Sequence, residues 1–245
     1  GKPLQLTFER LNAVILKLVT MLIELAPYGV FSLLLTLFAV QGIGVIGDLA
    51  KYFFLLVFVL IFHGIVTYGL FLSLLAKLNP ITFFSKLRSL AIFAFSTSSS
   101  SATMPITLQT VRTKLGVRPS IGSFTVPLGA TVNMDGTAIM QGIATVFIAQ
   151  AYNMDLTTMD YLMVILTATL ASIGTAGVPG VGLIMLAMVL EQVGLPVEGI
   201  ALIIGVDRLL DMTRTAVNVC GDAMVSCVVA KSEGEFDKEV FDKRI

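Results

Sequence analysis

Residues 205–222 concentrate polar side chains within an otherwise apolar chain. Five of these side chains follow one another at steps of four, three, four and four residues: Asp207, Asp211, Arg214, Asn218 and Asp222. At about 100° per residue, all five fall within roughly 80° of arc on one face of a helix. A charge that faces lipid is energetically costly, so this stripe must face protein or a water-filled cavity. The alternative, a soluble helix with a solvated face, conflicts with the apolar stretches upstream.

The composition indicates an integral membrane protein. Of the 245 residues, 56% are hydrophobic and only 13% are charged, whereas ordinary soluble domains carry about 25% charged residues. Lys plus Arg and Asp plus Glu each number 16, so net charge favours no polyanionic partner such as a nucleic acid. Cys220 and Cys227 lie seven residues apart on one predicted helix, about 10.5 Å along its axis, which is too far for a disulfide.

Long apolar runs predict the helices. We expect one at 8–40 with an interruption near 24–28, one at 49–77 after a glycine-rich link, one at 119–150 broken at 133–137, and a last one at about 195–230. The only histidine, His63, lies in the middle of the second run, and we expect it to be a packing residue rather than a ligand or a base. The charged tail, 231–245, is expected to be solvated or disordered.

Two pairs of apolar arms are too short to cross a membrane singly. Arms 87–97 and 103–111 flank four serines, and arms 161–171 and 181–190 flank the glycine-rich stretch 172–180. A full span needs about 20 residues, so each pair predicts a re-entrant helical hairpin. Irregular backbone at membrane depth must be buried in protein or line a cavity. Serine hydroxyls and free backbone N–H groups at such a tip suit a carboxylate.

The loop charges predict opposite orientations for the two hairpins. Basic residues flank the first: Lys77, Lys86, Arg88, Arg112, Lys114 and Arg118. The loops beside the second carry only acidic residues: Asp155, Asp160, Glu191 and Glu198. By the positive-inside rule, the first hairpin enters from the cytoplasm and the second from outside. The predicted fold is therefore all-α and membrane-integral, with inverted repeats of a re-entrant hairpin plus a transmembrane helix, a design of secondary transporters.

Four motifs carry a resemblance to a known family. They are SSSSATMP at 98–105, PLGATVNMDGT at 127–137, ASIGTAGVPG at 171–180 and DMTRTAVNVCGD at 211–222. Their sequences and their order resemble the glutamate and aspartate transporter family, the dicarboxylate/amino acid:cation symporters. This family includes the archaeal aspartate transporters and the excitatory amino acid transporters. The resemblance covers essentially the whole chain.

The resemblance implies a function and a domain organisation. It implies a sodium-coupled symporter of aspartate and/or glutamate, not an enzyme, that works by an elevator alternating-access mechanism. The protein would be multi-pass in the cell membrane, in contact with membrane lipid, and a homotrimer. Residues 1–48 would be a scaffold helix and linker on the trimerisation side, 49–230 the transport domain with hairpins at about 82–113 and 158–192, and 231–245 a cytoplasmic tail. The family's earlier N-terminal segments are expected to be absent.

The resemblance also implies which residues hold the substrate. They are Ser99, Ser100, Thr137, Val178, Gly182, Asp211, Arg214, Thr215 and Asn218. Arg214 matches the arginine that grips the side-chain carboxylate of the substrate, a task that suits its planar fork. Asp211 matches the acceptor of the amino group. Asp207, two turns before Arg214, is placed to hold that arginine.

Sodium ions are the implied coupling ions. The matching positions for one site are Gly129, Asn133, Asn218 and Asp222. A second site, formed largely by the backbone, matches Thr131, Ser172, Ile173 and Thr175, and half of a third consists of Asn133 and Asp135. Oxygen ligands of this kind suit a hard cation. The competing interpretation of the hydroxyl residues is that each bonds back to its own helix.

Three positions depart from the family pattern. Met212 and Ser98 stand where vertebrate and archaeal members, respectively, carry an arginine, which counts against potassium counter-transport. Gln141 stands where vertebrate members carry a glutamate linked to proton coupling, and glutamine cannot carry a proton.

Three other functions compete with this one. A neutral amino acid carrier would not need Arg214, and a C4-dicarboxylate carrier would not need Asp211 as an amine acceptor, so the presence of both favours an acidic amino acid. An intramembrane aspartyl protease would need a carboxylate dyad, such as Asp135 with Asp211 or Asp222. The Asp-Gly-Thr sequence lies in a broken helix, however, and no base pairs obviously with a serine.

Overall fold

The computed structural model describes residues 45–243 and isolated positions before them: Arg10, Leu11, Val14, Lys17, Leu18, Met21, Tyr28, Phe31, Ser32, Leu35 and Ala39. The chain divides into two compact units, Gly1–Val45 and Ile46–Ile245. Each described position before residue 40 is helical. The expected interruption near 24–28 and most of the expected link at 41–47 lie outside the described residues. The second unit contains every element discussed below.

A long apolar helix opens the second unit. It runs through α2 (Val45–Phe62), the π-helical turn η1 (His63–Thr67), α3 (Tyr68–Phe71) and a second π-helical turn, η2 (Leu72–Ala76). Within the described part of the chain, its 30-residue stretch Gly47–Ala76 is the one helix long and apolar enough to cross a membrane, and an 18-residue segment of it has a mean hydropathy of 2.4. The sequence predicted the helix, but neither of its π-helical turns.

The first helix pair consists of α4 (Pro80–Thr97) and α5 (Ser100–Thr113). Helix α4 begins seven residues before the predicted arm because Asn79 caps it, accepting a hydrogen bond from the backbone N–H of Ile81 at 2.9 Å. It ends at Ser98, whose φ of 51° is left-handed. Ser99 then caps α5 by accepting from the N–H of Ala102 at 3.1 Å. The non-helical tip is therefore only two residues long.

The next helix is broken where the sequence predicted a break. Helix α6 (Pro119–Val132) ends at Asn133, and α7 (Asp135–Ala151) begins after Met134. Amide and carboxylate side chains compete with the backbone for hydrogen bonds and so disfavour a helix interior.

The second helix pair has a longer tip. Helix α8 (Thr158–Ile173) starts at a capping box between Thr157 and Asp160, and α9 (Val181–Gln192) ends the pair. The connection 174–180 is non-helical, and Gly180 adopts a left-handed φ of 80°. The two hydrogen bonds from Thr157 hold the pKa of Asp160 below its usual value.

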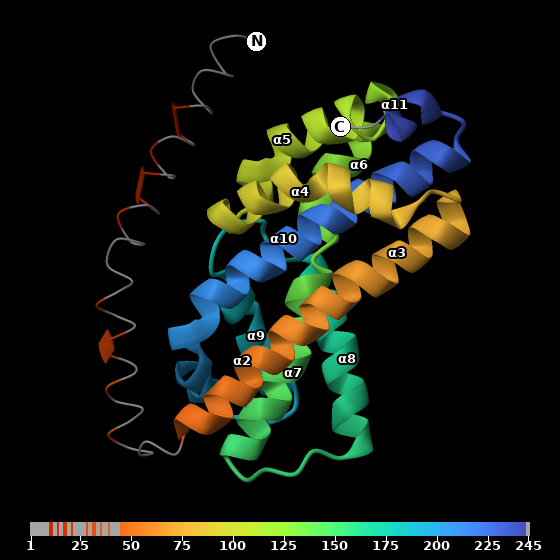
Figure 1. Cartoon of the computed structure of the whole chain (residues 1–245). Coiled ribbons are helices and arrows are strands. Elements are labelled where there is room, and N and C mark those ends of the chain that lie inside the picture. The colour runs from red at the N-terminus through yellow and green to blue at the C-terminus, as the bar shows by residue number, and fades with distance from the viewer. Residues whose placement is uncertain are drawn as a thin grey trace. The chain divides into compact units, whose positions relative to one another are not determined.

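Helix α10 (Ile200–Ser232) is the central element of the unit, preceded by the short 3-10 turn η3 (Val197–Gly199). It packs against α4, α5, α6 and α7 (Figure 1). The side chains of its polar stripe are buried. The expected chain order is observed: a helix pair and a broken helix, then a second helix pair and α10. Residues 45–243 form no strand apart from one isolated bridge, so the all-α prediction is confirmed for them.

The C-terminal tail is ordered over residues 231–243, although most of these residues are exposed to solvent, as expected. It folds back, pairs Phe236 with Val117 in an antiparallel bridge, and ends in α11 (Lys238–Asp242), where Phe241 is only 1% exposed. The N–H of Asp237 donates to the carbonyl of Gly116 at 2.7 Å. Gly116 permits this approach because its φ is +76° and a Cβ there would collide with the carbonyl oxygen of Asp237. Two aromatic residues among the charges thus supply an apolar anchor.

Candidate functional site

Both helix-pair tips, the break before α7 and the middle of α10 meet around one small buried cavity. Its lining residues are Ser98, Ser100, Met134, Thr137, Thr175, Gly177, Val178, Gly182, Asp211, Thr215 and Asn218. Seven of the nine predicted substrate residues line it; Ser99 and Arg214 lie immediately behind. The cavity measures about 20 Å³, which is room for about one water molecule. A solute the size of an amino acid therefore requires the tips to move apart.

The two tips touch directly. Both the hydroxyl of Ser99, at 2.7 Å, and the N–H of Ser101, at 3.1 Å, donate to the carbonyl of Gly177. A Cβ on Gly177 would lie 2.9 Å from the carbonyl oxygen of Ala130 and from Oγ of Ser101. Glycine is needed here because the backbone of the second tip passes so close to α5 and α6.

Arg214 is the most buried charged residue of the site, at 1% exposure. Its Nη1 lies 2.6 Å from Oδ1 of Asp207, and its Nη2 lies 2.9 Å from Oδ1 of Asp211. A second contact joins Nη2 to the other oxygen of Asp207 at 3.4 Å, so this pair is bidentate. The prediction that Asp207 holds Arg214 is confirmed.

Asp211 connects this ion pair to the second tip. While Oδ1 faces Arg214, Oδ2 accepts a hydrogen bond from the N–H of Gly180 at 3.1 Å. The same carboxylate therefore fixes the guanidinium and the start of α9. Any change in its partners alters the tip and the arginine together.

The predicted first sodium set is brought together. Asn133 donates from Nδ2 to Oδ1 of Asp222 at 3.0 Å and to the carbonyl of Asn218 at 3.2 Å. A Cβ on Gly129 would collide with the carboxylate of Asp222, so the backbone of α6 lies directly against it. Asn218 accepts at Oδ1 from the N–H of Gly136 at 2.8 Å. The carboxylate of Asp222 and the carbonyl of Asn218 thus face the amide nitrogen of Asn133 at the helix break. Such oxygens fit a hard cation, which Asn133 would help to bind only with its amide oxygen turned toward them.

The predicted second sodium set shows mainly local bonds. Thr131 donates to the carbonyl of Leu128 at 2.9 Å, Ser172 to that of Thr169 at 2.8 Å, and Thr175 to that of Ala171 at 2.8 Å. Ile173, the fourth member, is 45% exposed. Within residues 45–243, no hydrogen bond links Thr131 to the stretch 172–175. These hydroxyls bond back to their own segments. A sodium site here would therefore use backbone oxygens, as the resemblance implies, and that site stays a prediction.

Asp135, expected in the third sodium set, has partners that the sequence did not reveal. Its Oδ2 lies 2.6 Å from Nε2 of His63 and accepts a hydrogen bond from the hydroxyl of Tyr68. His63 was expected to pack, but its partner is a carboxylate, and the pair borders a cavity of about 290 Å³. His63 is the first residue of η1, and Tyr68 follows η1 as the first residue of α3. The wider π-helical turn brings residues five apart to similar directions, which an α-helical wheel does not predict.

Met134 and Gln141, at the helix break and on α7, are two further buried residues. Met134 lines the central cavity and accepts at its sulfur from Nδ2 of Asn218 at 3.2 Å. Gln141 on α7 is fully buried, and neither atom of its amide has a hydrogen-bond partner among the described residues. A buried amide without partners is costly, so its environment calls for polar contacts beyond those described.

Comparison with known proteins assigns the family. The model of the sodium:dicarboxylate symporter family matches residues 1–232. The chain belongs to the sodium:dicarboxylate symporter family. This family is one of symporters, which removes the support for the intramembrane protease alternative.

Individual relatives agree with this assignment. The excitatory amino acid transporter 1 of Rattus norvegicus is 41% identical over 231 residues, which is 94% of this chain and 42% of that protein. The proton/glutamate-aspartate symporter of Escherichia coli is 38% identical over 97% of this chain and 54% of its own length. The proton/sodium-glutamate symport protein of Bacillus subtilis is 36% identical over 97% and 55%. The chain thus spans about half the length of the curated relatives it matches.

Proposed function

We propose that this chain forms the substrate-binding part of a sodium-coupled symporter of acidic amino acids, aspartate and/or glutamate. The observation that carries the proposal is the convergence of both helix-pair tips on a cavity that Asp211 borders, with Arg214 directly behind it. The names of the relatives, which mention glutamate, aspartate, protons and sodium, are consistent with this substrate class.

Charge matching favours an acidic amino acid. Arg214 has two carboxylate partners, of which Asp207 holds it with both oxygens and Asp211 with one. An incoming side-chain carboxylate can replace Asp211 at Nη2, and Asp211 can then accept the substrate ammonium. The α-carboxylate would be held by N–H groups at the tips, around Ser100 and Val178, and by the amide of Asn218. Arg214 would therefore pair with the side-chain carboxylate of the substrate, and Asp211 would pair with its ammonium group.

The count of buried charges in the polar stripe supports cation coupling. Asp207, Asp211 and Asp222 are buried, against one buried Arg214 in the stripe. An acidic amino acid adds a further negative charge, and buried charge without compensation is costly. Sodium ions held near Asp222, by Gly129, Asn133 and Asn218, would supply that compensation. They would be transported together with the substrate.

The moving parts follow from the same proposal. Residues 49–230 would carry the cargo across the membrane as an elevator, against the helix at 8–40. The second tip would be the gate, because ions bound at Ser172, Ile173 and Thr175 would require it to be closed. The protein would lie in the cell membrane as a multi-pass homotrimer. Supporting these roles are the long apolar helix Gly47–Ala76 and the glycine-rich tip.

Proton coupling is the alternative that the relatives raise, since two of their names include protons. Uptake of labelled aspartate and glutamate into vesicles, by the protein that carries this chain, separates the cases. The proposal predicts uptake driven by a sodium gradient at equal pH on both sides. Uptake driven only by a proton gradient would contradict sodium coupling, and uptake of succinate or alanine in preference to aspartate would indicate the C4-dicarboxylate or neutral amino acid alternative.

A further inference from the structure

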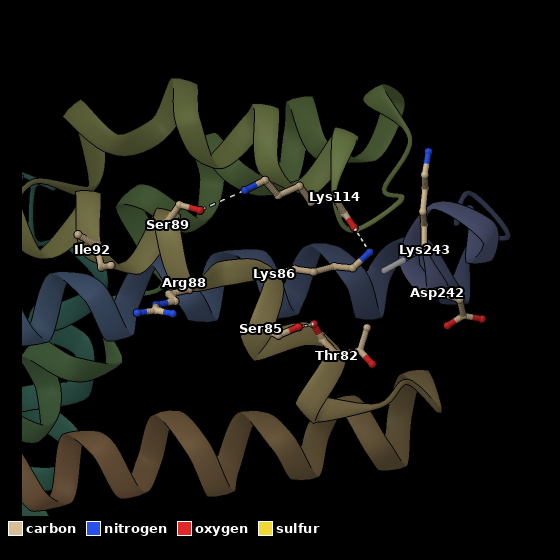
Figure 2. A pocket seen from close by; sticks show the side chains of 9 residues that line it. All are labelled: Thr82, Ser85, Lys86, Arg88, Ser89, Ile92, Lys114, Asp242 and Lys243. Carbon is tan, nitrogen blue, oxygen red and sulfur yellow. Dashed lines mark hydrogen bonds between the residues drawn. The ribbon is translucent and has the colours of Figure 1, made fainter. Parts of the chain in front are cut away.

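A third cavity lies far along α4 from the tips, where the C-terminal tail folds against the first helix pair (Figure 2). It measures about 720 Å³ and is lined by Thr82, Ser85, Lys86, Arg88, Ser89, Ile92, Lys114, Asp242 and Lys243. Four of these residues are basic and one is acidic. None of them has a role in the proposed transport site. The excess of positive charge makes this cavity a candidate site for an anion.

Lys86 is the buried centre of the cavity wall. The residue is only 3% exposed, and its ammonium donates to the carbonyl of Lys114 at 2.9 Å and to that of Val240 at 2.8 Å. Both acceptors are neutral, so they orient the charge without cancelling it. An ammonium has three donors, which leaves one for a ligand. The ring of Phe241, 5.6 Å from Nζ, adds a contact from the tail.

Lys114 and the hydroxyl residues complete the wall. The ammonium of Lys114 donates to Oγ of Ser89 at 3.1 Å, which draws it across to α4 (Figure 2). Thr82 and Ser85 supply further hydroxyls from the same helix. Ammonium, guanidinium and hydroxyl donors on one concave surface are the groups that bind phosphate oxygens.

We propose that this basic cavity binds a phosphate group, and that its source is the headgroup of an anionic phospholipid. Two observations favour a lipid over free phosphate. Ile81 and Ile92, on the same helix as Lys86, are 79% and 58% exposed, and these apolar side chains suit an acyl chain beside the headgroup. The basic loops around the first helix pair also place the cavity at the cytoplasmic surface by the positive-inside rule, where basic pockets between helices bind anionic headgroups.

The ligand would bridge two segments that are distant in sequence. Lys86 and Arg88 belong to α4, whereas Lys243 follows α11. A bound phosphate would therefore hold the tail against the first helix pair. Because ligand binding to the folded state alone stabilises it, binding would raise the melting temperature.

The test uses the protein that carries this chain, purified in detergent and titrated with three probes. These are phosphatidylglycerol, phosphatidylcholine and inorganic phosphate, with the melting temperature as the readout. The proposal predicts a stabilisation by phosphatidylglycerol and none by phosphatidylcholine. An equal stabilisation by inorganic phosphate would support the site and assign it to free phosphate instead of lipid.

Matched variants test the location of the site. Lys114→Gln and Arg88→Gln should each weaken the phosphatidylglycerol effect about fivefold in apparent affinity. Arg112→Gln removes the same charge from an exposed position on α5 outside the cavity and should leave that affinity unchanged. The proposal is overturned if neither anion stabilises the protein, or if Arg112→Gln weakens the effect as much as Lys114→Gln.

Discussion

The two helix-pair tips meet at the same cavity but are held in different ways. The first tip is two residues long, is capped by Ser99, and belongs to a helix pair to which the C-terminal tail is fastened through Lys86 and Gly116. The second tip has seven non-helical residues and is joined to α10 by one hydrogen bond from Gly180 to Asp211. Glycines permit large backbone changes at small steric cost. The comparison supports the proposal of a fixed first tip and a movable second tip, whose closure would depend on the residues proposed to bind substrate.

The largest effect is expected at Arg214, directly behind the central cavity. Arg214→Cys should reduce acidic amino acid uptake at least about 100-fold, because a buried bidentate charge contact is lost and Asp207 is left unpaired. Neutral amino acids then become candidates for uptake. Arg208→Cys, at an exposed position on the same helix, serves as the control. If Arg214→Cys binds aspartate with unchanged affinity, Arg214 does not determine the substrate class and the assignment is wrong.

A smaller effect is expected at the proposed cation ligands. Asp222→Asn and Asp135→Asn should each weaken sodium binding and aspartate binding together by about 5- to 150-fold, since linked sites share one coupling free energy. Sodium titrations monitored by aspartate binding measure both, with the exposed loop variant Asp155→Asn as the control. If the sodium titration of a variant matches that of the parent, the replaced carboxylate is not a sodium ligand.

The contact between the tips can be disrupted sterically. A methyl group at Gly177 would lie 2.9 Å from two oxygens, whereas one at Gly174 would meet only the carbonyl oxygen of Ala171 at 3.8 Å. Gly177→Ala should therefore separate the tips and lower aspartate affinity about tenfold. Gly174→Ala should bind aspartate as the parent does. Equal affinities in the two variants would show that the tip contact has no part in binding.

The smallest effect is expected at the first tip. Ser99→Ala removes the cap of α5 and the hydrogen bond to Gly177, and should cost about 1 kcal/mol of stability. Ser96→Ala, which loses only a bond to its own helix, should cost less. Chemical denaturation of the two variants measures the difference. A larger loss in Ser96→Ala would contradict the role of Ser99 in fixing the tip.

Much of this arrangement could be predicted from sequence because local chemistry determines it. The serine run, the Asn-Met-Asp-Gly sequence at 133–136 and the glycine-rich stretch 174–180 each break a helix for reasons contained in those residues, and all three breaks are observed. The four-three-four-four spacing likewise predicted one polar stripe, and α10 buries it.

What the sequence did not reveal depends on contacts between distant segments. The π-helical turn that aligns His63 with Tyr68 has no clear local signal, and it determines the partners of Asp135. The docked tail depends on Phe241 finding a pocket beside Lys86, more than 150 residues earlier in the chain. The composition of the tail shows its charge, but it does not show that Phe236 and Phe241 attach the tail to the rest of the unit.

Site-directed labelling of the two tips tests the central claim most directly. Val178→Cys and Ser100→Cys, each in a background without Cys220 and Cys227, are treated with an impermeant thiol reagent from outside, with and without sodium and aspartate. If the second tip is the gate, labelling of Val178→Cys falls when sodium and aspartate are both present. Ser100→Cys is then not labelled from outside in any of these conditions. Equal protection of Val178→Cys in all conditions, together with opening of Ser100→Cys from outside, would reverse the roles of the two tips.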